Sequence, residues 1–63
     1  MREIVSTATA AEILGVAPGT LRYWRYMDIG PRSFRVGRHV KYQREDIDAW
    51  VTSQLATTAR GGG

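Results

Sequence analysis

The chain has 63 residues, no cysteine, and nine Lys plus Arg against six Asp plus Glu, which gives a formal net charge of +3 and a pI near 10.0. A chain this short buries only about 60% of the surface that it exposes when unfolded, so it forms one small domain without a deep, enclosed catalytic cleft. The lack of cysteine excludes a disulfide framework and a thiolate metal site. No apolar run approaches the roughly 18 residues of a membrane span, and the first residues lack the layout of a secretory signal. We therefore expect a cytoplasmic protein without a membrane partner.

The first predicted helix follows Ser6, whose side chain suits the capping position before a helix. Residues at the spacing i, i+3, i+4 and i+7 then form one buried side, which consists of Thr7, Ala10, Ala11 and Leu14. Gly15 comes just after the last of them, where a left-handed residue commonly ends a helix. The sequence therefore predicts a helix that stops at this glycine.

A second predicted helix runs from Pro18 to about Met27, because proline is tolerated at a first helical position. Leu21 and Trp24 lie together on one side of it, which predicts burial. The opposite side is polar and aromatic and carries Arg22, Tyr23 and Tyr26. Glycine and proline at 30 and 31 end the helix in a loop.

Two short β-prone runs, 33–36 and 39–42, flank the dipeptide Gly37-Arg38, which predicts a hairpin with a two-residue turn of type II′. Alternation along the runs predicts a ribbon that packs on one side only. The apolar set expected on the packed side is Phe34, Val36, Val40 and Tyr42, and the polar set expected in solvent is Arg35, His39 and Lys41.

The last predicted helix begins near Arg44 and buries an apolar set made of Ile47, Trp50, Val51 and Leu55. Trp24 and Trp50 are the large anchors expected for the core. The apolar pattern is lost after Gln54. We therefore expect one domain over residues 1–55 and a flexible tail over residues 56–63.

These elements predict a mainly α fold with a small β-hairpin, and particular segments resemble known families. Residues 10–16 (AAEILGV) and 18–24 (PGTLRYW) resemble the first two helices of the MerR-like and excisionase-like families. Residues 36–42 (VGRHVKY) and 44–51 (REDIDAWV) resemble the short wing and the closing helix of phage excisionases. The resemblance implies a winged helix-turn-helix. It favours a stand-alone DNA-binding accessory protein, because MerR-type activators continue into a long dimerisation helix and an effector domain.

The charge distribution also indicates DNA binding, since residues 20–42 contain six basic residues and one acid. Lys and Arg bind DNA by replacing condensed counterions at phosphates, whereas base edges provide specificity. In helix-turn-helix proteins the second helix enters the major groove. The predicted DNA-binding residues are therefore Thr20, Arg22, Tyr23 and Tyr26 on that helix, and Arg35, Arg38, His39 and Lys41 on the hairpin.

Within this set, Arg22 is the best candidate for a bidentate contact with guanine, because its planar fork matches the O6/N7 edge. Tyr23 and Tyr26 are assigned to phosphates or sugars, and the start of the second helix at 17–19 to a phosphate. Each group also has an alternative role that involves no DNA. The hairpin charges could simply be solvated, and the two tyrosines could pack against the wing. Arg25 lies nearer the buried edge and is assigned to a pair with Asp28 or another acid.

Other chemistry finds little support in the sequence. His39 is the only histidine and has no cysteine or second histidine to share a metal. The acids at 45, 46 and 48 open the last helix, where the helix dipole and a pair between Arg44 and Asp48 explain them. Ser6 is not expected to be a nucleophile, because the sequence offers no general base to activate it. We expect no enzyme activity, no cofactor and no small-molecule substrate.

The resemblance implies a function as well as a fold. An excisionase binds in several copies, cooperatively and head to tail, at the arm of an attachment site, bends the DNA, and helps a phage integrase to assemble for excision. Two alternatives remain from the sequence alone. One is a prophage-type transcriptional regulator with the same fold, and the other is a basic RNA-binding module.

Overall fold

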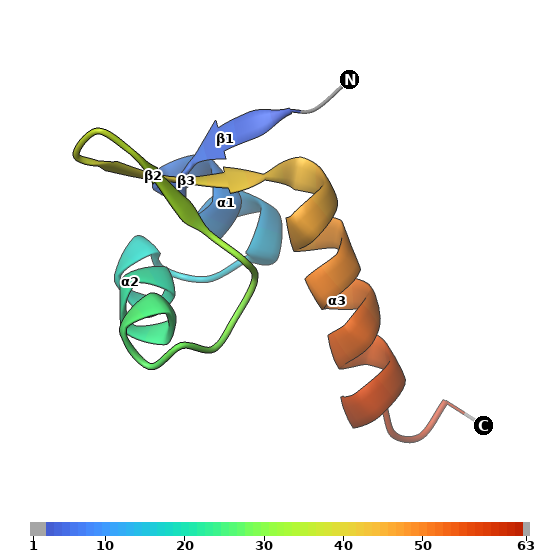
Figure 1. Cartoon of the computed structure of the whole chain (residues 1–63). Coiled ribbons are helices and arrows are strands. Elements are labelled where there is room, and N and C mark those ends of the chain that lie inside the picture. The colour runs from blue at the N-terminus through green and yellow to red at the C-terminus, as the bar shows by residue number, and fades with distance from the viewer. Residues whose placement is uncertain (1–2, 63) are drawn as a thin grey trace.

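A computed structural model of the chain describes residues 3–62. The elements follow the order β1 (Ile4–Ser6), α1 (Thr7–Leu14), α2 (Pro18–Tyr26), β2 (Phe34–Val36), β3 (His39–Gln43) and α3 (Arg44–Thr58). The three strands form one antiparallel sheet in the order β1-β3-β2, with the helices packed to one side of it (Figure 1). This arrangement confirms the predicted winged helix-turn-helix, with one more strand than the sequence indicated.

Helix α1 begins and ends where the sequence predicts. The Ser6 side chain accepts a hydrogen bond from the backbone N–H of Thr9 at 3.1 Å, which satisfies one of the free donors of the first turn. Gly15 adopts the left-handed conformation, with φ of 72°, and its N–H returns to the carbonyl of Glu12. Pro18 occupies the first turn of α2. The turn between the helices is therefore short and places α2 against α1.

The sheet corrects the predicted packing of the hairpin. Its register pairs Phe34 with Lys41 and Arg35 with Val40, so paired residues share a face of the sheet. Phe34 and Val36 therefore lie on the face opposite to Val40 and Tyr42, and Val36 is 51% exposed. The prediction of one common apolar face was wrong because a two-residue turn fixes this pairing whatever the apolar pattern is.

Strand β1 completes the sheet and was not predicted. It is only three residues long, Ile4–Ser6, and its backbone pairs with residues 41–43 of β3. Val5 pairs with Tyr42, and both are buried. A run this short carries too little alternation to be recognised as a strand. Its pairing makes β3 the central strand of the sheet.

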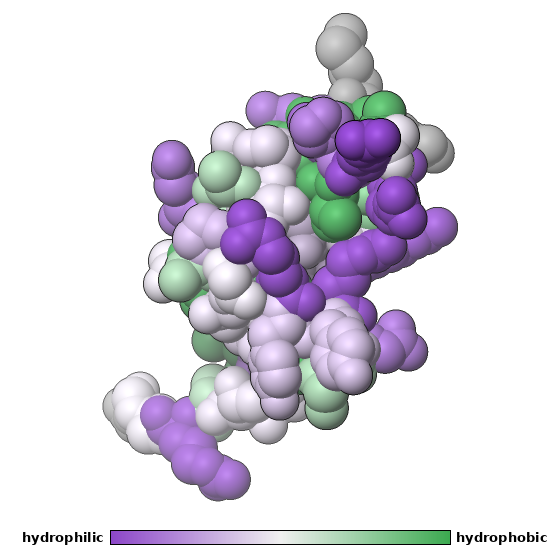
Figure 2. Space-filling view, turned by 90° about the vertical axis from the view of Figure 1, so that its left-hand side faces the viewer, coloured by the Kyte–Doolittle hydropathy of each residue, from purple (hydrophilic) through white to green (hydrophobic). Residues whose placement is uncertain are grey.

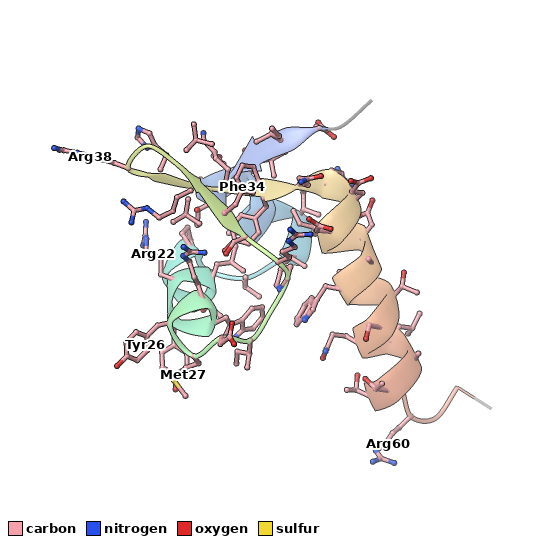
Figure 3. The ribbon with its side chains drawn as sticks, in the orientation of Figure 1. Arg22, Tyr26, Met27, Phe34, Arg38 and Arg60 are labelled. Carbon is pink, nitrogen blue, oxygen red and sulfur yellow. The ribbon has the colours of Figure 1, made fainter. Side chains whose placement is uncertain are left out.

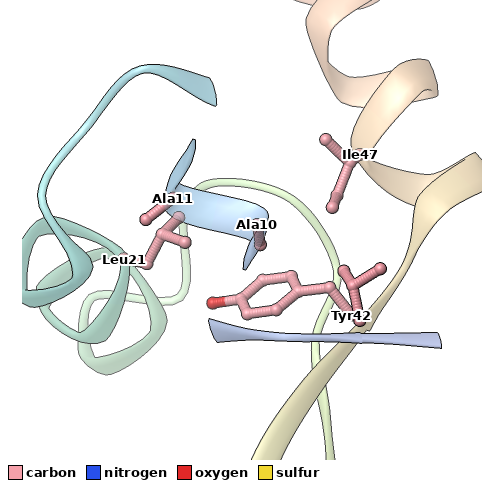
Figure 4. Packing of buried hydrophobic residues seen from close by; sticks show 6 residues of the cluster. Ala10, Ala11, Leu21, Tyr42 and Ile47 are labelled. Carbon is pink, nitrogen blue, oxygen red and sulfur yellow. The ribbon is translucent and has the colours of Figure 1, made fainter. Parts of the chain in front are cut away.

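The fully buried core is small and lies between the sheet and the three helices. It contains Val5, Ala10, Ala11, Leu21, Tyr42 and Ile47 (Figure 4). The two tryptophans that the sequence nominated as anchors are only partly buried. Their rings pack against each other with centroids 5.2 Å apart, which joins α2 to α3. Gly30 has φ of 81°, and a Cβ there would meet the Trp24 ring at 2.9 Å, so the loop after α2 closes over this ring.

Helix α3 differs from the prediction in its second half. It continues to Thr58, past the point at which the apolar pattern is lost, so the expected tail boundary at 56 lies inside the helix. The hydroxyl of Thr58 donates to the carbonyl of Gln54 at 2.6 Å. Val51 is 45% and Leu55 67% exposed, so their predicted burial was wrong. The reason is geometric, since α3 extends away from the sheet after its first turns (Figure 1).

Tyr42 carries a titratable group into this core. Burial raises the pKa of its hydroxyl above the ordinary value, and a hydrogen bond with the Ser33 side chain and the charge of Arg25 offset part of that rise. The folded protein therefore holds this proton more tightly than the unfolded chain does. Ionisation of Tyr42 favours unfolding, so its contribution to stability is present at neutral pH and is lost as the pH rises above about 10.

Replacing Tyr42 by Phe tests this assignment. We expect the wild-type free energy of unfolding to fall between about pH 9 and about pH 12, and that of Tyr42→Phe to fall less, because the variant has no phenol to ionise. Urea unfolding at a series of pH values measures both profiles. Tyr26→Phe is the control, since Tyr26 is 85% exposed and its loss should leave the wild-type profile intact. Parallel profiles for wild type and Tyr42→Phe would contradict the assignment.

Candidate nucleic-acid interface

One side of α2 faces outward, as the sequence predicts. Arg22 is exposed, Tyr23 is 58% exposed and Tyr26 is 85% exposed, while Leu21 on the opposite side is buried. Thr20 lies in the first turn and is partly buried. In Figure 3 Arg22 extends from α2 towards the hairpin, and Tyr26 lies at the other end of the helix. The side chains expected to contact DNA therefore follow the length of α2.

A half-open groove of about 490 Å³ lies between α2, β3 and the start of α1. Its lining contains four residues of formal positive charge and no acid. The charged residues are Arg22, Arg25, Arg38 and Lys41, accompanied by His39, Val40, Tyr42 and the first residues of α1. Like charges gathered without a carboxylate favour an anionic ligand, because an anion relieves their mutual repulsion.

The groove follows the edge of β3 that β1 leaves unpaired. Pairing between these strands ends at Ser6 and Lys41, and the Thr7 hydroxyl then donates to the carbonyl of Val40 at 3.0 Å. The start of α1, at residues 6–8, forms a wall of the groove as a result. From the sequence a phosphate was expected at the start of α2, and this wall was not predicted. The cap at Ser6 was the available signal, because it places the positive end of a helix dipole at that point.

The hairpin residues are distributed over two faces of the sheet. Arg38 stands at the tip, beside Gly37 with φ of 61°, and projects away from the body of the molecule (Figure 3). His39 and Lys41 line the groove, but strand alternation places their side chains on the face opposite to Val40 and Tyr42. Arg35 folds back on the hairpin, where its Nη2 donates to the carbonyl of Gly37 at 3.3 Å.

The structure thus brings half of the predicted set together and places the other half around it. The groove unites Arg22, Arg38, His39 and Lys41. The remaining four, Thr20, Tyr23, Tyr26 and Arg35, lie outside the groove lining. Figure 2 faces this side of the molecule and shows strongly hydrophilic side chains spread over it, with small apolar areas between them.

Arg25 has a different partner from the one that the sequence predicted. Its Nη1 donates to the Ser33 hydroxyl at 2.7 Å, so its partner is not the acid that was expected. Arg25 lines the groove together with Arg22, which precedes it by one turn on α2. The spacing of three residues between these arginines was the signal that places both on neighbouring positions of one helix face.

The acids of the molecule lie elsewhere. Glu45 and Asp46 fall in the first turn of α3, where they complement the helix dipole. The predicted pair between Arg44 and Asp48 is confirmed, with Nε and Oδ1 3.2 Å apart. Within residues 3–62, no three His, Cys, Asp or Glu side chains gather in a way that would hold a metal ion. No helix in that range is long and apolar enough to span a membrane.

Comparison with known proteins agrees with the geometry. Residues 4–55 match the family described as a helix-turn-helix domain, which covers both helices of the turn, the hairpin and most of α3. A search of curated proteins returned no match. On the strength of the family match and of its own architecture, the chain belongs to the helix-turn-helix domain family and is a DNA-binding domain.

Proposed function

We propose that this chain is a sequence-specific DNA-binding and DNA-bending accessory protein, an excisionase that directs an integrase towards prophage excision. The main support for a DNA interface is the groove between α2 and the hairpin. Its lining has four cationic residues and no acid. A duplex carries phosphates on both sides of its major groove. Helix α2 and the hairpin can therefore contact the same duplex at the same time.

In this proposal α2 enters the major groove, which is about 12 Å wide and accepts a helix. Arg22 reads a guanine, and Thr20, Tyr23 and Tyr26 contact neighbouring base edges, sugars or phosphates. The wing residues Arg35, Arg38, His39 and Lys41 contact the backbone beside it. Support comes from exposure: Arg22 and the two tyrosines of α2 stand in solvent, and Arg38 projects from the hairpin tip (Figure 3).

The recombination role is supported by the resemblance of the wing at 36–42 and of the closing helix at 44–51 to phage excisionases. A domain of this size makes few base contacts, so useful specificity needs several copies on adjacent sites, cooperatively bound. The basic hairpin lies at one end of the sheet and the acids of the α3 first turn at the other, which suits head-to-tail neighbours. The partners are then the attachment-site arm, the integrase and further copies of the chain.

Arg22→Ala tests the base-reading helix. We expect a loss of roughly 1–3 kcal/mol on the specific site and relaxed preference at one base pair, because a bidentate contact is removed. Binding measured on a library of single-base variants of the site gives both quantities. Arg60→Ala is the control, since Arg60 lies beyond α3, far from α2 (Figure 3). An equal loss on random duplex would show that Arg22 contacts the backbone only.

Reconstituted recombination tests the excisionase role. With a phage integrase and its attachment-site DNA, we expect excision to require the chain and integration to proceed without it. Footprinting on the same DNA should show adjacent protected segments, with bends that permuted fragments detect by gel mobility. Promoter repression with excision unaffected by the chain would instead favour a transcriptional regulator. Tighter binding to single-stranded RNA than to any duplex would contradict the DNA interface itself.

A further inference from the structure

The groove lining includes Arg25, a cationic residue that was not among the DNA-binding residues predicted from the sequence. Arg25 follows Arg22 by one turn of α2, and both line the groove with Arg38 and Lys41. Arg25 also lines a smaller hollow of about 170 Å³ with Asp28, Arg32 and Ser33. Arg25 therefore lies between the groove and this hollow, next to the loop that leads into β2, and it is exposed to solvent.

The guanidinium of Arg25 is held in place. Its Nη1 donates to the Ser33 hydroxyl at 2.7 Å, across eight residues of sequence. Ser33 is partly buried, and it lies close enough to the Tyr42 hydroxyl to lower the pKa of that group. Tyr42 is 1% exposed, and its hydroxyl lies on the α2 side of the core, near Leu21 (Figure 4). The partner of Arg25 is thus a partly buried side chain beside the core.

This arrangement leaves most of the binding capacity of Arg25 unused. A guanidinium has five N–H donors in a fixed fork, and the contact with Ser33 uses one nitrogen. A phosphate accepts hydrogen bonds from such a fork without any change in its orientation. Because Ser33 already restricts the side chain, less rotamer entropy is lost when an anion binds.

We propose that Arg25 is a phosphate-contacting residue of the DNA interface and that Ser33 is its positioning residue. The inference rests on the proposed binding of duplex DNA, and it adds a contact that neither the sequence pattern nor the family match assigns. A phosphate is favoured over a base because Arg25 lies in the last turn of α2 and is bonded to Ser33 outside the helix, whereas the N-terminal residues of a recognition helix contact base edges.

A double-mutant cycle on a labelled duplex of random sequence tests both roles. For Arg25→Ala we expect affinity to fall about fivefold at moderate salt and the slope of log affinity against log salt to decrease by about one. For Ser33→Ala we expect a fall of about two- to threefold with an unchanged slope, because all charges remain. The double variant should bind like Arg25→Ala alone, since Ser33 has nothing left to position. Arg25→Lys retains the charge and should keep the wild-type slope.

The controls separate this inference from the function on which it rests. Arg60→Ala removes the same charge far from the groove and should leave affinity and slope unchanged. Arg38→Ala should lower the slope whether or not Arg25 contacts DNA, so it reports on the interface as a whole. If Arg38→Ala lowers the slope and Arg25→Ala does not, the proposed interface stands and the contact by Arg25 is refuted. If the effects of Ser33→Ala and Arg25→Ala add in the double variant, the positioning role is refuted.

Discussion

The placement of β3 between β1 and β2 is the constraint on which the rest of the structure depends. The two-residue turn at 37–38 pairs Arg35 with Val40, and β1 pairs Val5 with Tyr42, so the inward face of β3 is fixed from both sides. That face supplies Tyr42 to a core of only six buried residues. The same register leaves the outer part of the β3 edge unpaired, and the groove follows this edge. One strand thus determines both the core and the proposed binding surface.

The position of α2 relative to this strand has two supports of different kinds. Apolar packing holds the inner side, with Leu21 in the core and Trp24 against Trp50 of α3. A polar link through Ser33 holds the side that faces the hairpin. The groove between them is rich in positive charge, and water and salt screen that charge in the free protein. In the proposed complex an anionic duplex replaces these counterions, and the same charges then attract its phosphates.

Local signals in the sequence were sufficient for much of the fold. The cap at Ser6, the left-handed Gly15 and the proline at the start of α2 each act within one turn, so both ends of α1 and the start of α2 were predictable. The faces of the hairpin were not, because the pairing of strands overrides the apolar pattern of Phe34 and Val36. Strand β1 and the exposure of Leu55 depend on contacts between distant segments, which no local pattern encodes. The partner of Arg25 was mispredicted for the same reason, since Ser33 lies in the loop after α2.

The groove between α2 and the hairpin is the surface that we propose meets DNA. Backbone amide chemical shifts, followed by NMR while the labelled protein is titrated with a short duplex, test it most directly. We expect the largest changes on residues 20–26, 33–42 and the start of α1, and little change in the second half of α3. Changes centred on Val51 and Leu55, with the groove unaffected, would contradict it.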